Sequence, residues 1–192
     1  MFLKETNTPE ARAFLEKDRV ANGYVMNLER AWAWRPDVAE AFASLRKQLM
    51  EGSTLASREF AVLVCATAQA LGDSYCALAW GARLAALTDS SLAADILRDR
   101  EAPGLTPREA ALRRWAGQVV REPNGCDGGQ VEALRAAGLS EKEIFEATAF
   151  ISFRLAFSTV NDALGAQPDP ELSATAPSEV RAAVNFGRPP AP

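Results

Sequence analysis

The feature that most constrains the fold is a series of helix start signals along almost the whole chain. Thr8-Pro9 places an N-cap residue and an N1 proline before an apolar pattern. Thr106-Pro107-Arg108-Glu109 and Ser140-Glu141-Lys142-Glu143 have the pattern of a capping box. Glycines stand where several of these helices are expected to end, and almost no segment alternates as a strand would. The sequence therefore predicts an all-α fold.

Two of the expected helices differ from the others in their apolar content. Residues 58–71 are nearly all apolar and too many for an average strand, so a buried helix is predicted there. Residues 140–164 carry large apolar side chains around most of the helix circumference, so we expect this helix at the centre of the fold. The expected helices cover residues 9–22, 25–33, 36–52, 58–71, 74–87, 92–97, 107–121, 131–137 and 140–164.

Length and composition predict one soluble domain. The chain has 192 residues, of which 48% are hydrophobic and 24% are charged, as in ordinary globular proteins. No apolar run approaches the length of about 20 residues that a membrane span needs. We expect an all-helical domain over residues 1–166. Residues 167–192 form a proline-rich tail that is expected to be extended and to pack on a partner subunit.

Charge and cysteine content exclude several classes of function. Lys and Arg total 21 against 25 Asp and Glu, and the net charge of −4 argues against binding of nucleic acid through a basic face. The N-terminus has no secretory pattern, so we expect a cytoplasmic protein. The three cysteines, Cys65, Cys76 and Cys126, lack zinc-site spacing and are expected to be reduced thiols, with no metal bound.

The residue that most clearly indicates chemistry is Cys76, in the first turn of the helix expected after Gly72. With Asp73 as N-cap, free backbone N–H groups and the positive end of the helix dipole lower the pKa of a thiol there. The Asp73 carboxylate, one turn away, raises the thiol pKa. The sequence leaves the direction of the net shift open.

Asp73, Cys76 and Trp80 share one face of the expected helix, because their spacing follows its period. Two interpretations fit this face. In one, the three side chains line a small cavity, and the indole N–H and the carboxylate bind a ligand. In the other, Cys76 and Trp80 are core side chains, since free cysteine is among the most buried residue types.

The segment Leu71-Gly72-Asp73-Ser74-Tyr75-Cys76-Ala77-Leu78-Ala79-Trp80 resembles the core motif of the alkylhydroperoxidase D-like and carboxymuconolactone decarboxylase superfamily. Residues 23–27 with 35–37, 134–140 and 160–165 are similar to its peroxidase-related branch. The likeness covers most of residues 20–165. It implies an alkylhydroperoxidase D-like helical bundle and a homo-oligomer. In active members it implies thiol-based reduction of peroxides, with a glutamate and a histidine as proton relay.

The superfamily motif is a C-x-x-C pair followed by a histidine, and this chain keeps one of those three residues. Cys76 matches the second cysteine, whereas Asp73 stands in place of the first and Trp80 in place of the histidine. An intramolecular C-x-x-C disulfide is therefore excluded. Glu59 is the nearest candidate for the relay glutamate, and its alternative role is to satisfy the start of its own helix.

These departures leave three hypotheses for function. In the first, Cys76 alone reduces a peroxide, becomes a sulfenic acid and is regenerated by an external thiol, with Asp73 or Glu59 as the base. In the second, redox activity is lost or replaced and the fold binds a small ligand. In the third, a decarboxylase or lactone-processing enzyme uses one of these carboxyls as a proton donor. No cofactor is expected, and we expect Trp80 and Tyr75 to contact the small-molecule substrate.

Overall fold

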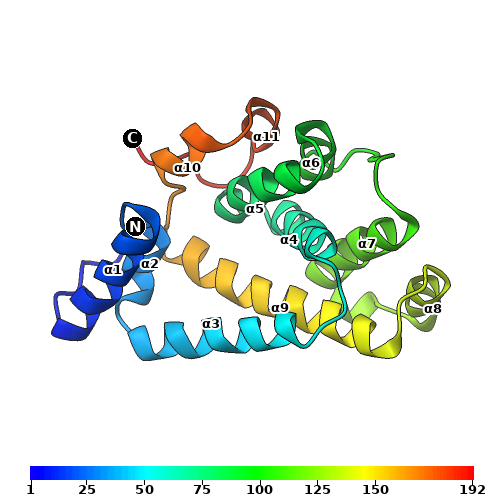
Figure 1. Ribbon diagram of the computed structural model, residues 1–192, viewed down its shortest axis with the longest axis horizontal. Helices are drawn as coiled ribbons and strands as arrows, with labels where there is room; N and C mark the ends of the chain where they lie inside the picture. The colour runs from blue at the N-terminus through cyan, green and yellow to red at the C-terminus, as the bar shows by residue number, and fades with distance from the viewer.

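The computed structural model describes residues 1–192 and consists of helices joined by short connections, with no strand (Figure 1). The prediction of an all-α fold is confirmed. In chain order the helices are α1 (Pro9–Asn22), α2 (Asn27–Trp32), α3 (Pro36–Glu51), α4 (Ser57–Leu71), α5 (Ser74–Leu87), α6 (Ser90–Leu97), α7 (Pro107–Arg121), the 3-10 turn η1 (Pro123–Gly125), α8 (Gly128–Ala136), α9 (Glu141–Ala163), α10 (Pro170–Thr175) and α11 (Ser178–Ala183). None of them combines the length and the apolar character that crossing a membrane requires.

Local cap chemistry sets the helix starts where the sequence predicted them. The Thr8 hydroxyl accepts a hydrogen bond from the Ala11 N–H, 3.2 Å away. Thr106 and Ser140 each form a capping box with the glutamate three residues later. These bonds use backbone N–H groups that would otherwise have no partner in the first helical turn. Most helix bounds could therefore be predicted to within a few residues.

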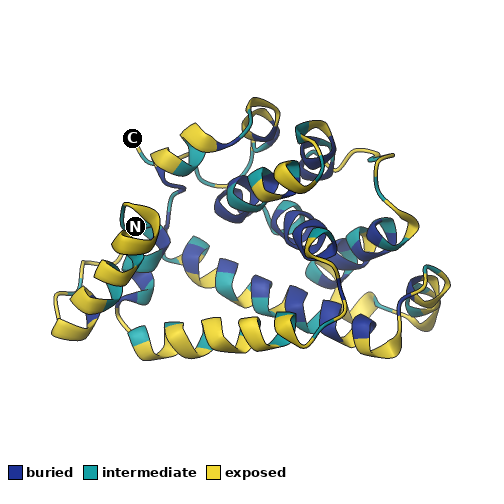
Figure 2. Ribbon diagram, viewed as in Figure 1, coloured by how far each residue is buried: buried dark blue, intermediate teal, exposed yellow.

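The central helix is α4, so the prediction that α9 would take that position is wrong. Every residue of α4 from 59 to 68 is buried, and the helix packs against α5, α6, α7 and α9. Figure 2 shows α4 in the buried colour along most of its length. On α9, by contrast, Phe145 is 70% exposed and Val160 is 36% exposed. The outer face of α9 is covered only in part, by α3, a helix that has no buried residue of its own.

The C-terminal segment also differs from the prediction of an extended tail. Pro170 is the N1 residue of α10, and Pro177 is the N-cap of α11. These prolines start helices, as Pro9 and Pro107 do earlier in the chain. Helix α11 packs on α5 and α6 of the same chain, where Val180 is completely buried. The segment is therefore part of the helical domain.

Two ion pairs cross between the starts of α4 and α7, which pack closely against each other. Arg58 pairs with Glu109 at 2.6 Å, and Arg108 pairs with Glu59 at 2.8 Å. Each glutamate also accepts a backbone N–H at the start of its own helix, at 2.8 Å in both cases. Because both carboxylates are buried, each pairing and capping interaction is shielded from water. The exchange of partners fixes the two helix starts against each other.

A buried carboxyl lies between α2 and the inner side of α3. Burial, together with the Asp18 charge, raises the pKa of Glu29 to about 7, and Arg46 opposes the shift. The folded protein therefore holds a proton that the unfolded chain releases at lower pH, and stability contributed by Glu29 is lost as the pH rises through about 7.

We expect the Glu29→Gln variant to be more stable than the parent at pH 8 by about 2 kcal/mol, and almost equally stable at pH 5. Chemical denaturation at the two pH values measures the difference. Glu40→Gln, which removes an exposed carboxylate, serves as the control. An equal effect of Glu29→Gln at both pH values would contradict the buried, protonated carboxyl.

Candidate functional site

Cys76 lies at the third position of α5, and the turn that precedes it is set by Gly72. Gly72 ends α4 with a φ of +82°, a left-handed conformation that favours glycine. The chain then reverses, so that Asp73 becomes the N-cap of α5 and its Oδ1 accepts the Cys76 N–H at 2.9 Å. The prediction that Asp73 caps this helix is confirmed. Only 4% of the surface of Cys76 is exposed.

Two side chains from the middle of α9 reach the sulfur. Nη2 of Arg154 donates to Cys76 Sγ at 2.8 Å, and the Ser158 hydroxyl lies 3.6 Å from the same atom. Both residues are buried, and their spacing of four places them on one face of the helix. Sequence reasoning did not find either residue. The signal was Arg154 itself, a single charge between the apolar residues Ile151 and Phe157 of a helix that had to be largely buried.

Burial decides the protonation state of the thiol. It raises the pKa of Cys76 to about 12; the Arg154 guanidinium acts in the opposite direction, and the Asp73 carboxylate adds to the increase. At neutral pH the resting site therefore contains a thiol that donates or accepts weak hydrogen bonds, and not a thiolate. This answers the question that the sequence left open.

The rate of Cys76 alkylation by iodoacetamide is expected to rise about tenfold per pH unit from pH 7 to pH 9, without a plateau, because only the thiolate reacts. Peptide-level mass spectrometry separates Cys76 from Cys65 and Cys126. Free cysteine, measured in parallel, flattens as it passes its own pKa near about 8.5. A plateau for Cys76 below pH 8 would contradict the assignment of a buried, protonated thiol.

Trp80 follows Cys76 by one helical turn and lies at an open cleft of about 360 Å³ between α3, α5 and α9. Arg83 stacks over its indole ring at 4.8 Å, and the Arg154 guanidinium is 5.5 Å from the ring centroid. Arg154 therefore contacts Cys76 Sγ and also lines the cleft. The structure brings Cys76, Trp80 and Arg154 together.

Asp73 is almost completely buried, and one of its carboxylate oxygens, Oδ2, has no hydrogen-bond partner. Its charge, added to burial, raises the pKa of Asp162 to about 7, while Arg188 opposes the shift. Asp162 follows Ser158 by four residues and so continues the face of α9 that begins with Arg154. Sequence reasoning did not single out Asp162.

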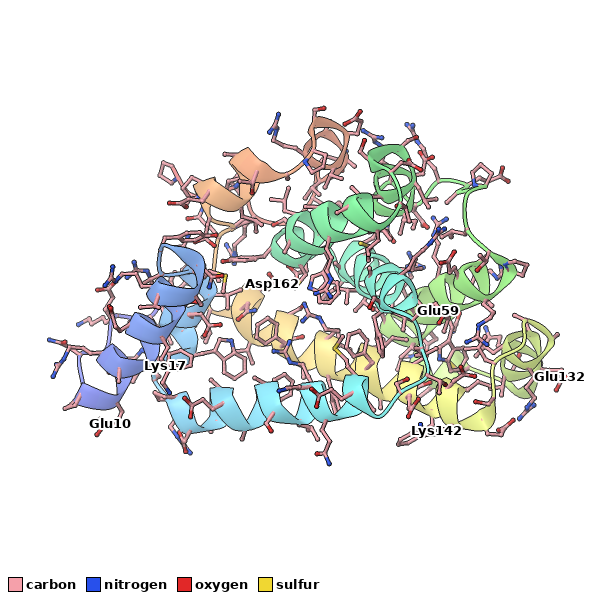
Figure 3. The ribbon with its side chains drawn as sticks, viewed as in Figure 1. Glu10, Lys17, Glu59, Glu132, Lys142 and Asp162 are labelled. Atoms are coloured by element: carbon pink, nitrogen blue, oxygen red, sulfur yellow. The ribbon has the colours of Figure 1, made fainter.

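Tyr75 and Glu59 are not brought to Cys76. The Tyr75 hydroxyl donates to Asp169, and its ring packs with Leu28 and Ala166 in a small separate cluster. Glu59 lies at the start of α4, about 20 Å along that helix from the end that leads to Cys76. Figure 3 shows Glu59 well separated from Asp162. The contacts of Glu59 are those of the capping role that the sequence offered as its alternative.

The remaining cysteines are free thiols, as is Cys76. Cys65 on α4 is completely buried, and burial raises its pKa, with a smaller contribution from the charge of Cys76. Cys126 is half-buried in the connection before α8. No group of three or more His, Cys, Asp or Glu side chains is arranged to hold a metal ion.

The largest surface hollow, of about 590 Å³, lies elsewhere, between α4, α7 and the connection from α6 to α7. Its Asp99 pairs with Arg113 and Arg121, and no cysteine lines it. The smaller cleft beside Trp80 is therefore the candidate site, because it adjoins the one cysteine with a polar environment.

Solved structures with the same arrangement of helices include a peroxidase-related protein with an alkylhydroperoxidase AhpD core from Ralstonia eutropha JMP134. It matches with a TM-score of 0.77 at 23% identity, over 89% of this chain and 93% of that chain. A peroxidase-related protein from Silicibacter sp. TM1040 matches with a TM-score of 0.77 at 21% identity over the same shares. A Cys-to-Ala variant of the debrominase Bmp8, in complex with 2,3,4-tribromopyrrole, matches with a TM-score of 0.70 at 18% identity, over 90% of this chain and 92% of that chain.

No protein-family model and no curated protein sequence matches the chain. The match to the solved structures extends over nearly the whole of both chains, including the segment around Cys76. The chain therefore has the AhpD-like fold, and the resemblance that the motif around Cys76 indicated is confirmed at the level of the fold.

Proposed function

We propose that this AhpD-like protein is a thiol-dependent oxidoreductase that reduces peroxides through Cys76 alone. The observation that carries the proposal is the contact of 2.8 Å between Arg154 Nη2 and Cys76 Sγ. A guanidinium at that distance stabilises negative charge on sulfur and on an oxygen that leaves it. Arg154 thereby supplies the positive charge that an imidazolium would supply in a chain that has no histidine.

The proposed reaction begins with transfer of the thiol proton, since the resting sulfur is protonated. Asp162, whose pKa is raised to about 7, is suited to accept a proton near neutral pH, and Ser158 lies between it and the sulfur along α9. The thiolate attacks one peroxide oxygen, the O–O bond breaks, and the departing oxygen takes up the proton as water or an alcohol. Asp73 acts as a positioning residue, because it holds the Cys76 backbone N–H.

The product on the enzyme is a sulfenic acid at Cys76. Two equivalents of an external thiol reduce it, giving back the Cys76 thiol, a disulfide of the reductant and one water. An external thiol is required because Asp73 stands where a neighbouring cysteine would form an internal disulfide. The proposal keeps the homo-oligomer as the expected assembly and adds no cofactor.

Trapping of the sulfenic acid tests the proposal. The Cys126→Ser protein is treated with cumene hydroperoxide in the presence of dimedone, and the adduct is located by mass spectrometry. We expect an adduct at Cys76 that forms at least tenfold more slowly in Asp162→Asn, and at an unchanged rate in Glu59→Gln. Absence of the Cys76 adduct in the folded parent protein would overturn the proposal.

A second candidate function is binding of a small ligand without redox chemistry. The observation that favours it is the deep burial of Cys76, with a thiol pKa of about 12. The occurrence of this fold in a debrominase supports reuse of the site for other small molecules. Under this hypothesis, 2,3,4-tribromopyrrole or a similar planar probe binds beside Trp80 and no dimedone adduct forms.

A further inference from the structure

The walls of the cleft beside Trp80 carry an excess of positive charge. Four cationic side chains line it against a single carboxylate, that of Glu51, which is exposed and pairs with Lys47 at 3.6 Å. The other three cations are Arg46, Arg83 and Arg154, and none of them has an acidic partner within 4.0 Å. The Glu29 charge is felt by Arg46 only at longer range.

These three guanidinium groups lie over aromatic rings. Arg46 is 4.7 Å from the Phe157 centroid, and Arg154 is 5.2 Å from the same ring. Arg83 covers Trp80 at 4.8 Å. Stacking on a ring holds a guanidinium in place while leaving its edge N–H groups free for an acceptor.

Two buried nitrogen atoms at the cleft lack the acceptor that this arrangement prepares for. Nε of Arg154 and Nε of Arg46 are inaccessible to water and have no hydrogen-bond partner, and the side chain of Arg154 is more than nine-tenths buried. A buried N–H without a partner costs free energy that a bound acceptor would recover. The mutual repulsion of the two cations, which lowers the pKa of Arg46, would also be relieved by an anion.

We propose that this cleft binds an organic anion, a carboxylate on an apolar or aromatic body, and that it thereby selects the substrate of Cys76. The anionic group contacts Arg46, Arg83 and Arg154, and the apolar body packs on Trp80 and Phe150, which also line the cleft. A volume of about 360 Å³ accommodates one or two fused aromatic rings. The assignment rests on the proposed function and names its substrates as hydroperoxides that carry a carboxylate.

Binding of an unreactive acid tests this site separately from the redox reaction. Naphthalene-2-carboxylate and its neutral carboxamide are titrated into the Cys76→Ser protein by calorimetry at low ionic strength. We expect the acid to bind at least tenfold more tightly than the carboxamide. Arg83→Met, at an exposed position, is expected to weaken the acid about tenfold, and Arg12→Met, which removes a distant exposed arginine on α1, is expected to leave it unchanged.

Equal affinity for the acid and the carboxamide, or no binding of the acid at millimolar concentration, would overturn this proposal. Neither result depends on redox activity, because Cys76→Ser has no thiol at the site. Conversely, tight binding of the acid together with absence of the dimedone adduct in the Cys126→Ser protein would retain the anion site and reject only the peroxidase reaction.

Discussion

Replacing Arg154 with methionine is expected to slow alkylation of Cys76 at pH 8 at least tenfold. The guanidinium is the main group that favours the thiolate, and loss of an opposite charge at this distance raises a thiol pKa by about one unit or more. Below the pKa, each unit lowers the thiolate fraction tenfold. The variant is expected to fold, since it exchanges a buried cation without an acidic partner for an apolar side chain of similar length.

The measurement is the iodoacetamide rate at Cys76 in the Cys126→Ser background. Arg154→Lys keeps a cation near the sulfur and is expected to retain most of the parent rate, whereas Arg12→Met controls for the general loss of one arginine. A rate for Arg154→Met equal to that of the parent, with circular dichroism unchanged, would show that the contact with Arg154 does not stabilise the thiolate.

Glu109→Ala is expected to lower the free energy of unfolding by about 2 to 3 kcal/mol. The substitution removes the capping carboxylate of α7 and leaves Arg58 without its partner. Because the Arg58 side chain is 33% exposed, water compensates part of the loss. Urea denaturation measures the effect, with Glu101→Ala as the control at an exposed position that makes no ion pair. A loss no larger than that of the control would contradict the role of the crossed ion pairs.

Features that depend on neighbouring residues could be predicted from the sequence. The capping boxes at Thr106 and Ser140, and the cap that Asp73 forms on Cys76, involve residues only three positions apart, so the local pattern contains all of their chemistry. The same local reasoning failed for Pro170 and Pro177. Their helices are short and are stabilised by packing on α5 and α6, which no local pattern indicates.

The candidate site could be predicted only in part, for the same reason. Cys76 and Trp80 share a helix, and their common face followed from the helical period. Arg154 contacts Cys76 across 78 residues of sequence, and that pairing depends on how α9 crosses α5. Glu59 shows the converse case: it seemed a candidate relay from its position in sequence, yet its carboxylate pairs with Arg108 at the far end of α4.

Peroxide consumption by the parent protein and by Cys76→Ser, with dithiothreitol as reductant, tests the central claim most directly. The account predicts that the parent protein consumes cumene hydroperoxide catalytically and that Cys76→Ser loses at least about 99% of that rate, because no other thiol contacts Arg154. Equal rates for the two proteins, or no consumption by the folded parent protein, would contradict the claim that Cys76 works alone as a reducing thiol.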